Sequence, residues 1–129
     1  VPASITLAQG LIESAAGTSR LAQKANNHFG IKVGTTWTGP YMIMADDRPD
    51  DKFRVYRSVT ESFEDHSLFL RNGSRYAFLF NLKANDYKGW ARGLKQAGYA
   101  TSPTYANTLI NTIERYNLTT FDLNAHDSR

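Results

Sequence analysis

The stretch from Ser4 to Lys32 constrains the fold more than any other part of this chain. Its apolar residues recur at the spacing of one helix face, which predicts that this face is buried; they are Ile5, Ala8, Leu11, Ile12 and Ala15. Ser4 is a residue type that caps helix N-termini, and Gly17 is one that ends helices. We therefore predict an amphipathic helix that begins after Ser4 and ends near Gly17.

Glu13 is the residue of this helix that indicates chemistry. It lies in the last turn, where the helix dipole already concentrates negative charge. Its neighbours one turn away are small apart from Gln9, which leaves room for a ligand. The dipole and partial burial would both raise the pKa of the Glu13 carboxyl, and a protonated carboxyl is what a general acid needs. Most helix glutamates are solvated surface residues, so position alone does not assign this role.

After this helix the sequence predicts a short second helix with a turn, and then a β-hairpin. A short helix capped by Thr18 or Ser19 is expected to run through Ala25, and residues 26–30, rich in Asn and Gly, favour a turn. Strand-favouring residues then predict an antiparallel hairpin with strands over 41–44 and 52–56. The loop between these strands contains four aspartates, a composition also common in solvated turns, and it lacks the residue spacing of an EF-hand calcium loop.

The second half of the chain is predicted to be helical. Residues 58–61 form a capping-box pattern that opens a helix reaching about Asn72. A short apolar segment over 77–82 precedes a helix capped by Asp86 and ended by Gly98. Ser102 and Pro103 predict the start of the last helix, as N-cap and first helical residue. We expect residues 1–118 to form the folded domain and residues 119–129 to be a flexible tail or linker.

Length and composition narrow the possible function classes. A chain of 129 residues is expected to form one domain, and the absence of cysteine excludes disulfides, zinc–thiolate sites and a thiolate nucleophile. Its three histidines, His28, His66 and His126, show no metal-ligand spacing, so we expect no metal and no other cofactor. The net charge of +3 suits an anionic partner such as a cell wall, but no basic patch or nucleic-acid-binding motif is present, so we expect no nucleic-acid partner.

No apolar run is long enough for a membrane span, and residues 1–3 do not resemble a signal peptide. The chain begins almost at a predicted helix start. We therefore expect it to come from a longer, multidomain precursor in which the export signal and a further N-terminal helix of the domain lie upstream. We also expect the chain to act as a monomer.

Several motifs together carry a resemblance to a known family. They are Glu-Ser-Ala-Ala-Gly-Thr-Ser-Arg-Leu-Ala over residues 13–22, Asn-Asn-His-Phe-Gly-Ile-Lys over 26–32, Asn-x-x-Arg-Tyr over 72–76 and Ala-Gly-Tyr-Ala-Thr-Ser-Pro-x-Tyr over 97–105. This pattern resembles the bacterial cell-wall glucosaminidases of glycoside hydrolase family 73, which include autolysins and the hydrolase domain of flagellar rod proteins. The resemblance covers about residues 2–118. It implies a mainly α, lysozyme-like fold of about five or six helices with a small antiparallel β-hairpin lobe.

The resemblance also implies residue roles. Glu13 matches the family's general acid, and Tyr99 matches an active-site tyrosine that can stack on a sugar face. The family's second acid comes from the hairpin lobe, where Asp46 and Asp47 lie nearest; many relatives have Glu there. We expect Glu13, the aspartate loop and Tyr99 to border an open substrate cleft. The further candidates for contact with the sugar are Gln9, His28, Trp37 and Tyr105.

The implied activity is hydrolysis of the β-1,4 glycosidic bond between N-acetylglucosamine and N-acetylmuramic acid in peptidoglycan, in the bacterial cell envelope or outside the cell. Glu13 would protonate the leaving oxygen, and either an aspartate-activated water or the substrate's own acetamido group would attack. A lytic transglycosylase could use the same single glutamate. A wall-binding module without catalysis would keep the aromatic residues but would not need Glu13.

Overall fold

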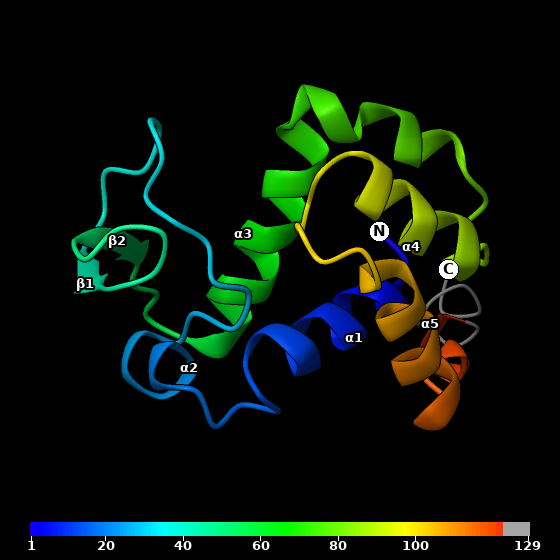
Figure 1. The fold of residues 1–129 in the computed structure, drawn as a ribbon, viewed down its shortest axis with the longest axis horizontal. Helices are drawn as coiled ribbons and strands as arrows, with labels where there is room; N and C mark the ends of the chain where they lie inside the picture. The colour runs from blue at the N-terminus through cyan, green and yellow to red at the C-terminus, as the bar shows by residue number, and fades with distance from the viewer. Residues whose placement is uncertain (123–129) are drawn as a thin grey trace. The chain divides into compact units, whose positions relative to one another are not determined.

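The computed structural model describes residues 1–122 of the chain (Figure 1). The elements in chain order are α1 (Ala3–Glu13), α2 (Arg20–Ala25), β1 (Tyr41–Met44), β2 (Asp51–Arg54), α3 (Val59–Asn72), the 3-10 helix η1 (Ser74–Asn81), α4 (Tyr87–Gln96) and α5 (Tyr105–Arg115). The prediction of a mainly helical fold with a small antiparallel hairpin is confirmed. None of the helices within residues 1–122 combines the length and apolar character that a membrane span requires.

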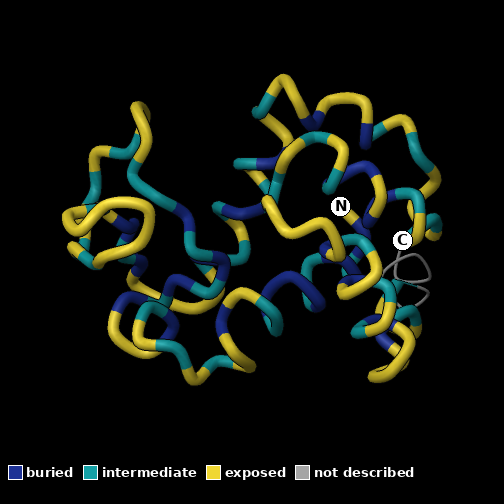
Figure 2. Tube along the Cα trace, viewed as in Figure 1, coloured by how far each residue is buried: buried dark blue, intermediate teal, exposed yellow. Residues whose placement is uncertain are grey.

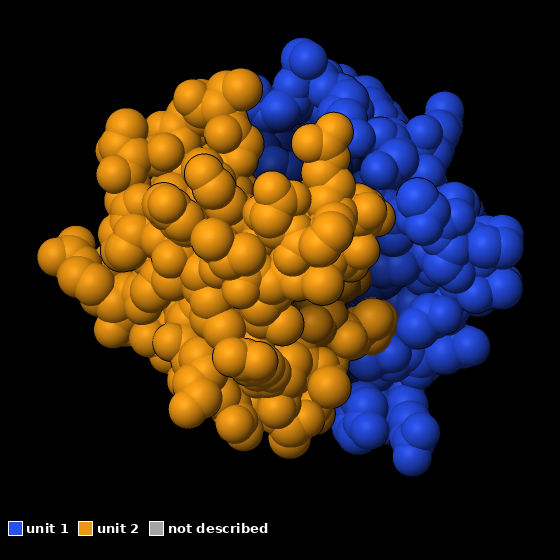
Figure 3. Space-filling view, turned by 60° about the vertical axis from the view of Figure 1, so that its left-hand side comes forward, with its two compact units in different colours: residues 1–9, 67–129 blue, residues 10–66 orange. Residues whose placement is uncertain are grey.

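The chain divides into two compact units (Figure 3). Unit 1 contains residues 1–9 and 67–129, and unit 2 contains residues 10–66. The division passes through α1 after Gln9 and through α3 after His66. Unit 2 therefore contains α2, β1 and β2 with the ends of α1 and α3, and unit 1 contains η1, α4 and α5 with the remaining parts of α1 and α3.

Unit 2 is built around the hairpin and the segment that pairs with it. Tyr41 pairs with Arg54 and Met44 with Asp51 in an antiparallel register, and Lys32 forms an additional bridge to Phe53 on the other side of β2. The loop over residues 45–50 is exposed (Figure 2), whereas Phe53 is 5% exposed. One face of the hairpin is thus buried while its connecting loop stays in solvent.

Asn27 joins the 26–30 turn to β2. Its side-chain amide donates to the backbone oxygens of Ile31 and Arg54, both at 2.9 Å, and its side-chain oxygen accepts from the Ile31 N–H at 3.1 Å. Asn27 is 1% exposed. The turn itself follows the prediction, since Asn26 and Gly30 have positive φ values of 53° and 68°.

Unit 1 has its core between α4, α5 and η1, and α4 packs against both other helices. The fully buried residues of this core include Leu79, Trp90, Leu94, Leu109 and Ile113. Trp90 and Leu94 in α4 are four residues apart, as are Leu109 and Ile113 in α5, which is the spacing of one helix face. Asp86 caps α4 as predicted, because its carboxylate accepts the Gly89 N–H at 3.0 Å.

Three predicted helix boundaries are wrong. Ser4 lies inside α1 instead of capping it, and its N–H and hydroxyl donate to the Asp122 carboxylate at 2.7 and 2.6 Å. The helix ends at Glu13 instead of near Gly17, because residues 15–17 all have positive φ. Thr104, not Ser102, is the N-cap of α5, since a turn intervenes in which the Tyr105 N–H donates to the Ser102 carbonyl at 3.2 Å.

A capping box has two hydrogen bonds, one from each side chain to the other residue's backbone N–H, and only one of them forms at the start of α3. Ser58 caps α3 by accepting the Glu61 N–H at 3.1 Å, but the Glu61 carboxylate pairs with Arg57 at 3.2 Å. Residues 119–122 of the predicted tail form a helical turn, and Asp122 binds Ser4 as described. Residues 123–129 of that predicted tail, including His126, lie outside the described residues.

Replacing Asn27 with Ala should destabilise the protein by about 2–4 kcal/mol, because it leaves two backbone oxygens and one N–H without their buried partner. The free energy of unfolding from denaturant titration measures this effect. Asn107→Ala, at an exposed position of α5, is the matched control and should change stability little. Equal stability of the two variants would show that water replaces the Asn27 amide.

Candidate active site

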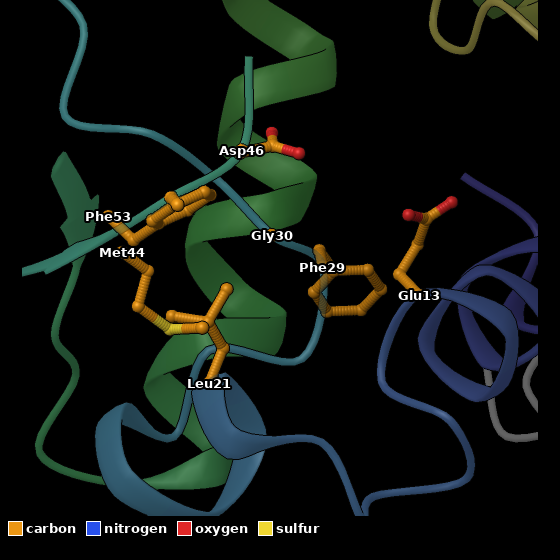
Figure 4. Close-up of a pocket in the computed structure, with 8 residues that line it drawn as sticks. Glu13, Leu21, Phe29, Gly30, Met44, Asp46 and Phe53 are labelled. Carbon is orange, nitrogen blue, oxygen red and sulfur yellow. The ribbon is translucent and has the colours of Figure 1, made fainter. Parts of the chain in front are cut away.

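A pocket of about 280 Å³ lies within unit 2, and both Glu13 and Asp46 line it (Figure 4). Its large apolar lining residues are Leu21, Phe29, Met44 and Phe53. In Figure 4 the Asp46 carboxyl points toward the side of the pocket on which Glu13 lies. Two carboxyl groups from distant parts of the sequence therefore border one pocket.

The backbone after Glu13 explains why this side chain stands at a helix end. Ala15, Ala16 and Gly17 adopt φ values of 49°, 57° and 84°, which an α-helix cannot continue. The Ser14 hydroxyl closes the turn by donating to the Gly10 carbonyl and accepting the Gly17 N–H. Glu13 is consequently the last residue of α1, in the turn where the sequence predicts it.

Burial raises the pKa of the Glu13 carboxyl above its ordinary value of 4.5. Glu13 as a whole remains exposed to solvent. The pocket atoms around the carboxyl nevertheless remove part of its hydration, and partial dehydration favours the neutral form. The predicted direction of the pKa shift is confirmed, and desolvation is its cause.

The floor of the pocket is aromatic. Phe29 is 4% exposed; it stacks on the His66 ring with centroids 3.8 Å apart and meets the Phe63 ring edge-on at 4.9 Å. Burial lowers the pKa of the His66 imidazole to about 3, so this ring is neutral at physiological pH and packs as an aromatic group. Phe29 is thereby held rigidly beneath the carboxyl groups.

The hairpin loop carries a charge cluster centred on Lys32. The Lys32 Nζ lies 3.1 Å from Asp46, 3.0 Å from Asp47 and 3.2 Å from Asp51. These three carboxylates have the spacing of a cation site, and the ammonium group stands where a metal ion would bind. Asp46 borders the pocket, whereas the Asp47 side chain is 86% exposed and does not line it.

A second ion pair lies behind this cluster. Arg54 is 9% exposed, donates to Asp65 at 2.8 Å and to the Lys32 carbonyl at 2.9 Å, and lies over the Trp37 ring. Asp65 also accepts from the Tyr56 hydroxyl, and burial together with this carboxylate raises the Tyr56 pKa. The carboxylate of Asp65 therefore has a specific buried partner in Arg54.

Tyr99, Gln9 and Tyr105 meet in unit 1. The Tyr99 and Tyr105 rings stack with centroids 5.8 Å apart, and Gln9 donates to the Tyr105 hydroxyl at 3.0 Å. Gln9 is fully buried and Tyr105 is 4% exposed, so the contacts of both are with the protein interior, and Tyr105 alone of the two is stacked on Tyr99. The expectation that Tyr99 faces Glu13 across a cleft stays a prediction.

The loop that carries Tyr99 is fixed at both sides. Gly98 has a φ of 84°, and the Tyr99 N–H donates to the Leu94 carbonyl at 3.0 Å, which is the pattern of a Schellman helix end. Lys95 donates to the carbonyls of Ala100 and Thr101 at 3.4 and 3.2 Å. Tyr99 itself is half-buried, which leaves part of its ring accessible.

The two remaining candidates, His28 and Trp37, belong to unit 2 but do not line its described pocket. The His28 backbone N–H donates to the Ser62 hydroxyl at 3.2 Å, and the Trp37 indole donates to the Pro40 carbonyl at 2.9 Å. Both thus have structural contacts that account for their positions. The ion pairs of Lys32 with the hairpin loop were not predicted from the sequence. The one indication that Lys32 matters was its place at the end of the motif over residues 26–32.

Comparison with known proteins places these residues in a family. The glucosaminidase family, described as mannosyl-glycoprotein endo-beta-N-acetylglucosaminidase, matches residues 1–118. This chain belongs to the glucosaminidase family. The predicted family, and with it the class of glycoside hydrolases, is confirmed.

Curated and solved relatives of this glucosaminidase-family chain agree with the match. Exo-glucosaminidase LytG of Bacillus subtilis is 38% identical over 92% of the chain, and the alignment covers 45% of LytG. The peptidoglycan hydrolase of Sphingomonas sp. A1 has a TM-score of 0.76 at 32% identity, covering 96% of this chain and 81% of that one. The glycoside hydrolase domain of Salmonella typhimurium FlgJ has a TM-score of 0.74 at 31% identity, covering 99% and 82%. The chain spans less than half the length of the curated relative LytG.

Replacing Glu13 with Gln should raise thermal stability at neutral pH. Because the folded state holds the Glu13 proton more tightly than the unfolded chain, ionisation of Glu13 costs stability as pH rises from 4.5 through the raised pKa. Thermal unfolding midpoints across pH should therefore favour E13Q at neutral pH and converge below pH 4.5. Glu64→Gln, at an exposed position of α3, is the control for loss of a helix glutamate and should leave the unfolding midpoint close to that of wild type.

Proposed function

We propose that this glucosaminidase-family chain hydrolyses the β-1,4 glycosidic bond between N-acetylglucosamine and N-acetylmuramic acid in peptidoglycan, with Glu13 as general acid. The observation that carries the proposal is a carboxyl group of raised pKa that shares a pocket with a second carboxyl group. The names of the relatives, an exo-glucosaminidase and a peptidoglycan hydrolase, support this substrate.

The first chemical step is protonation of the leaving group. Protonated Glu13 donates its proton to the glycosidic oxygen, and the bond between that oxygen and the anomeric carbon breaks with its electron pair going to the oxygen. Positive charge develops on the anomeric carbon and the ring oxygen. The raised pKa of Glu13 keeps more of the enzyme in the protonated form that this step requires.

The second step is attack on the anomeric carbon by water. Asp46 accepts one proton of this water while its oxygen bonds to the carbon, and Glu13 is reprotonated from solvent before the next turnover. Asp46 suits this role because it borders the pocket, which Asp47 does not. Attack by the substrate's acetamido group is the alternative, and it would need no second carboxylate.

Tyr99 is proposed to bind the sugar. Its half-accessible ring stacks on Tyr105 and its loop is held by Lys95, so one aromatic surface is presented in a fixed orientation. Since the curated relatives are longer than this chain, we propose that it acts as the catalytic part of a larger protein, in the bacterial cell envelope or outside the cell.

Digestion of purified peptidoglycan by wild type and Glu13→Gln tests the proposal. After borohydride reduction, mass spectrometry should find reduced N-acetylglucosamine ends with wild type and at least about a hundredfold fewer with E13Q, because a general acid contributes about that much or more. Glu64→Gln should match wild type.

Other products would change the proposal in defined ways. Reduced N-acetylmuramic acid ends would move cleavage to the other glycosidic bond, and anhydro ends would indicate a lytic transglycosylase. Binding of peptidoglycan without any product from wild type would favour a non-catalytic wall-binding module.

Asp46→Asn and Asp47→Asn form a matched pair that tests the second carboxylate. Each removes one negative charge from the same loop, but Asp46 alone of the two lines the pocket. We expect kcat to fall by roughly a hundredfold or more in D46N, as for loss of a general base, and far less in D47N. Equal, small effects on kcat would instead support attack by the acetamido group.

A further inference from the structure

The positive charge of Lys32 compensates the negative charges of three aspartates at the hairpin loop. One carboxylate oxygen from each of Asp46, Asp47 and Asp51 lies within 4.8 Å of the other two. Three negative charges at such distances repel and would drive the loop apart without a counter-ion. The Lys32 ammonium lies 3.0–3.2 Å from each of them and supplies that counter-charge.

The Lys32 backbone is attached to β2 and not to the loop. Lys32 bridges Phe53, and its carbonyl accepts from the Arg54 Nε at 2.9 Å. The hydrogen bonds on both sides, from the Val33 N–H to Lys52 and from the Arg54 N–H to Ile31, are each 3.0 Å long. The side chain therefore connects a fixed strand segment to an exposed loop.

We infer that Lys32 is a positioning residue for catalysis, because its ion pairs hold the loop over residues 45–50 so that the Asp46 carboxylate borders the pocket lined by Glu13. This inference rests on the proposed function, in which Asp46 activates water. Lys32 does not line the described pocket itself and acts through the carboxylates that it binds.

The contribution of Lys32 is geometric more than energetic. The Lys32 side chain is 35% exposed and that of Asp46 55%, and ion pairs at such exposure add little to the free energy of unfolding. Displacement of a catalytic group by a fraction of its contact distance, in contrast, is costly to turnover. Loss of Lys32 should consequently lower kcat while leaving the unfolding midpoint close to that of wild type.

Lys32→Met is the variant that isolates the charge. Methionine keeps an unbranched apolar chain near the Phe53 ring, over which the Lys32 Nζ lies at 5.8 Å from the centroid. Lys52→Met is the matched control, since it removes the same charge from β2, where the Lys52 ammonium lies over the Tyr41 ring. Lys32→Arg restores the charge and should recover part of the lost kcat.

We expect kcat for peptidoglycan to fall roughly 10- to 100-fold in K32M, with little change in KM, and to stay near wild type in K52M. Hydrogen exchange should also become faster at the Asp46 and Arg48 amides in K32M alone. These amides donate within the loop, to the Arg48 carbonyl and to the Asp51 carboxylate, each at 2.9 Å.

The double variant K32M/D46N separates positioning from a general effect of charge. If Lys32 acts through Asp46, the double variant should be no slower than D46N alone. Unchanged kcat in K32M, unchanged amide exchange, or losses of kcat that multiply in the double variant would each overturn the inference. An inactive wild type would defeat the proposed function instead, and the exchange measurement, which needs no substrate, would still decide whether Lys32 holds the loop.

Discussion

The side chain of Asn27 is the interaction on which the rest of unit 2 depends. Its amide group forms two hydrogen bonds with the Ile31 backbone, which close the turn, and one with the Arg54 carbonyl, which joins the turn to β2. Phe29 and Gly30, which line the pocket, lie inside the segment that Asn27 fixes. Lys32 follows directly, so the same amide fixes the point from which the ammonium reaches the hairpin loop.

The pocket consequently combines a rigid floor with a charged rim. Phe29 and Phe53 are almost fully buried and are held by ring contacts and strand pairing. Asp46 stands in an exposed loop whose position depends on ion pairs. A rigid apolar surface suits the face of a sugar ring, and a loop held by ion pairs presents the Asp46 carboxylate in a preorganised position.

The sequence predicts correctly those features that depend on residues close together in the chain. The place of Glu13 near a helix end, the strand over 41–44, the Asn26 turn and the Asp86 cap each follow from a few neighbouring residues. The Ser4 and Ser102 predictions were wrong because tertiary contacts or an extra turn replaced the expected caps. The Lys32 and Arg54 ion pairs could not be predicted, since their partners lie 11–19 residues away and only the folded register brings them together.

The turn after Glu13 contains strained backbone. Ala15 and Ala16 both adopt left-handed backbone angles, which disfavour residues with a Cβ by about 1–2 kcal/mol each. Backbone strain of this kind persists where the surrounding structure imposes it, and it concentrates at functional sites. A helix that continued to Gly17 would move Glu13 from the helix terminus into its interior. The strained turn instead leaves Glu13 as the terminal residue, at the helix end where a negative charge is unfavourable, and burial of its carboxyl raises the pKa there.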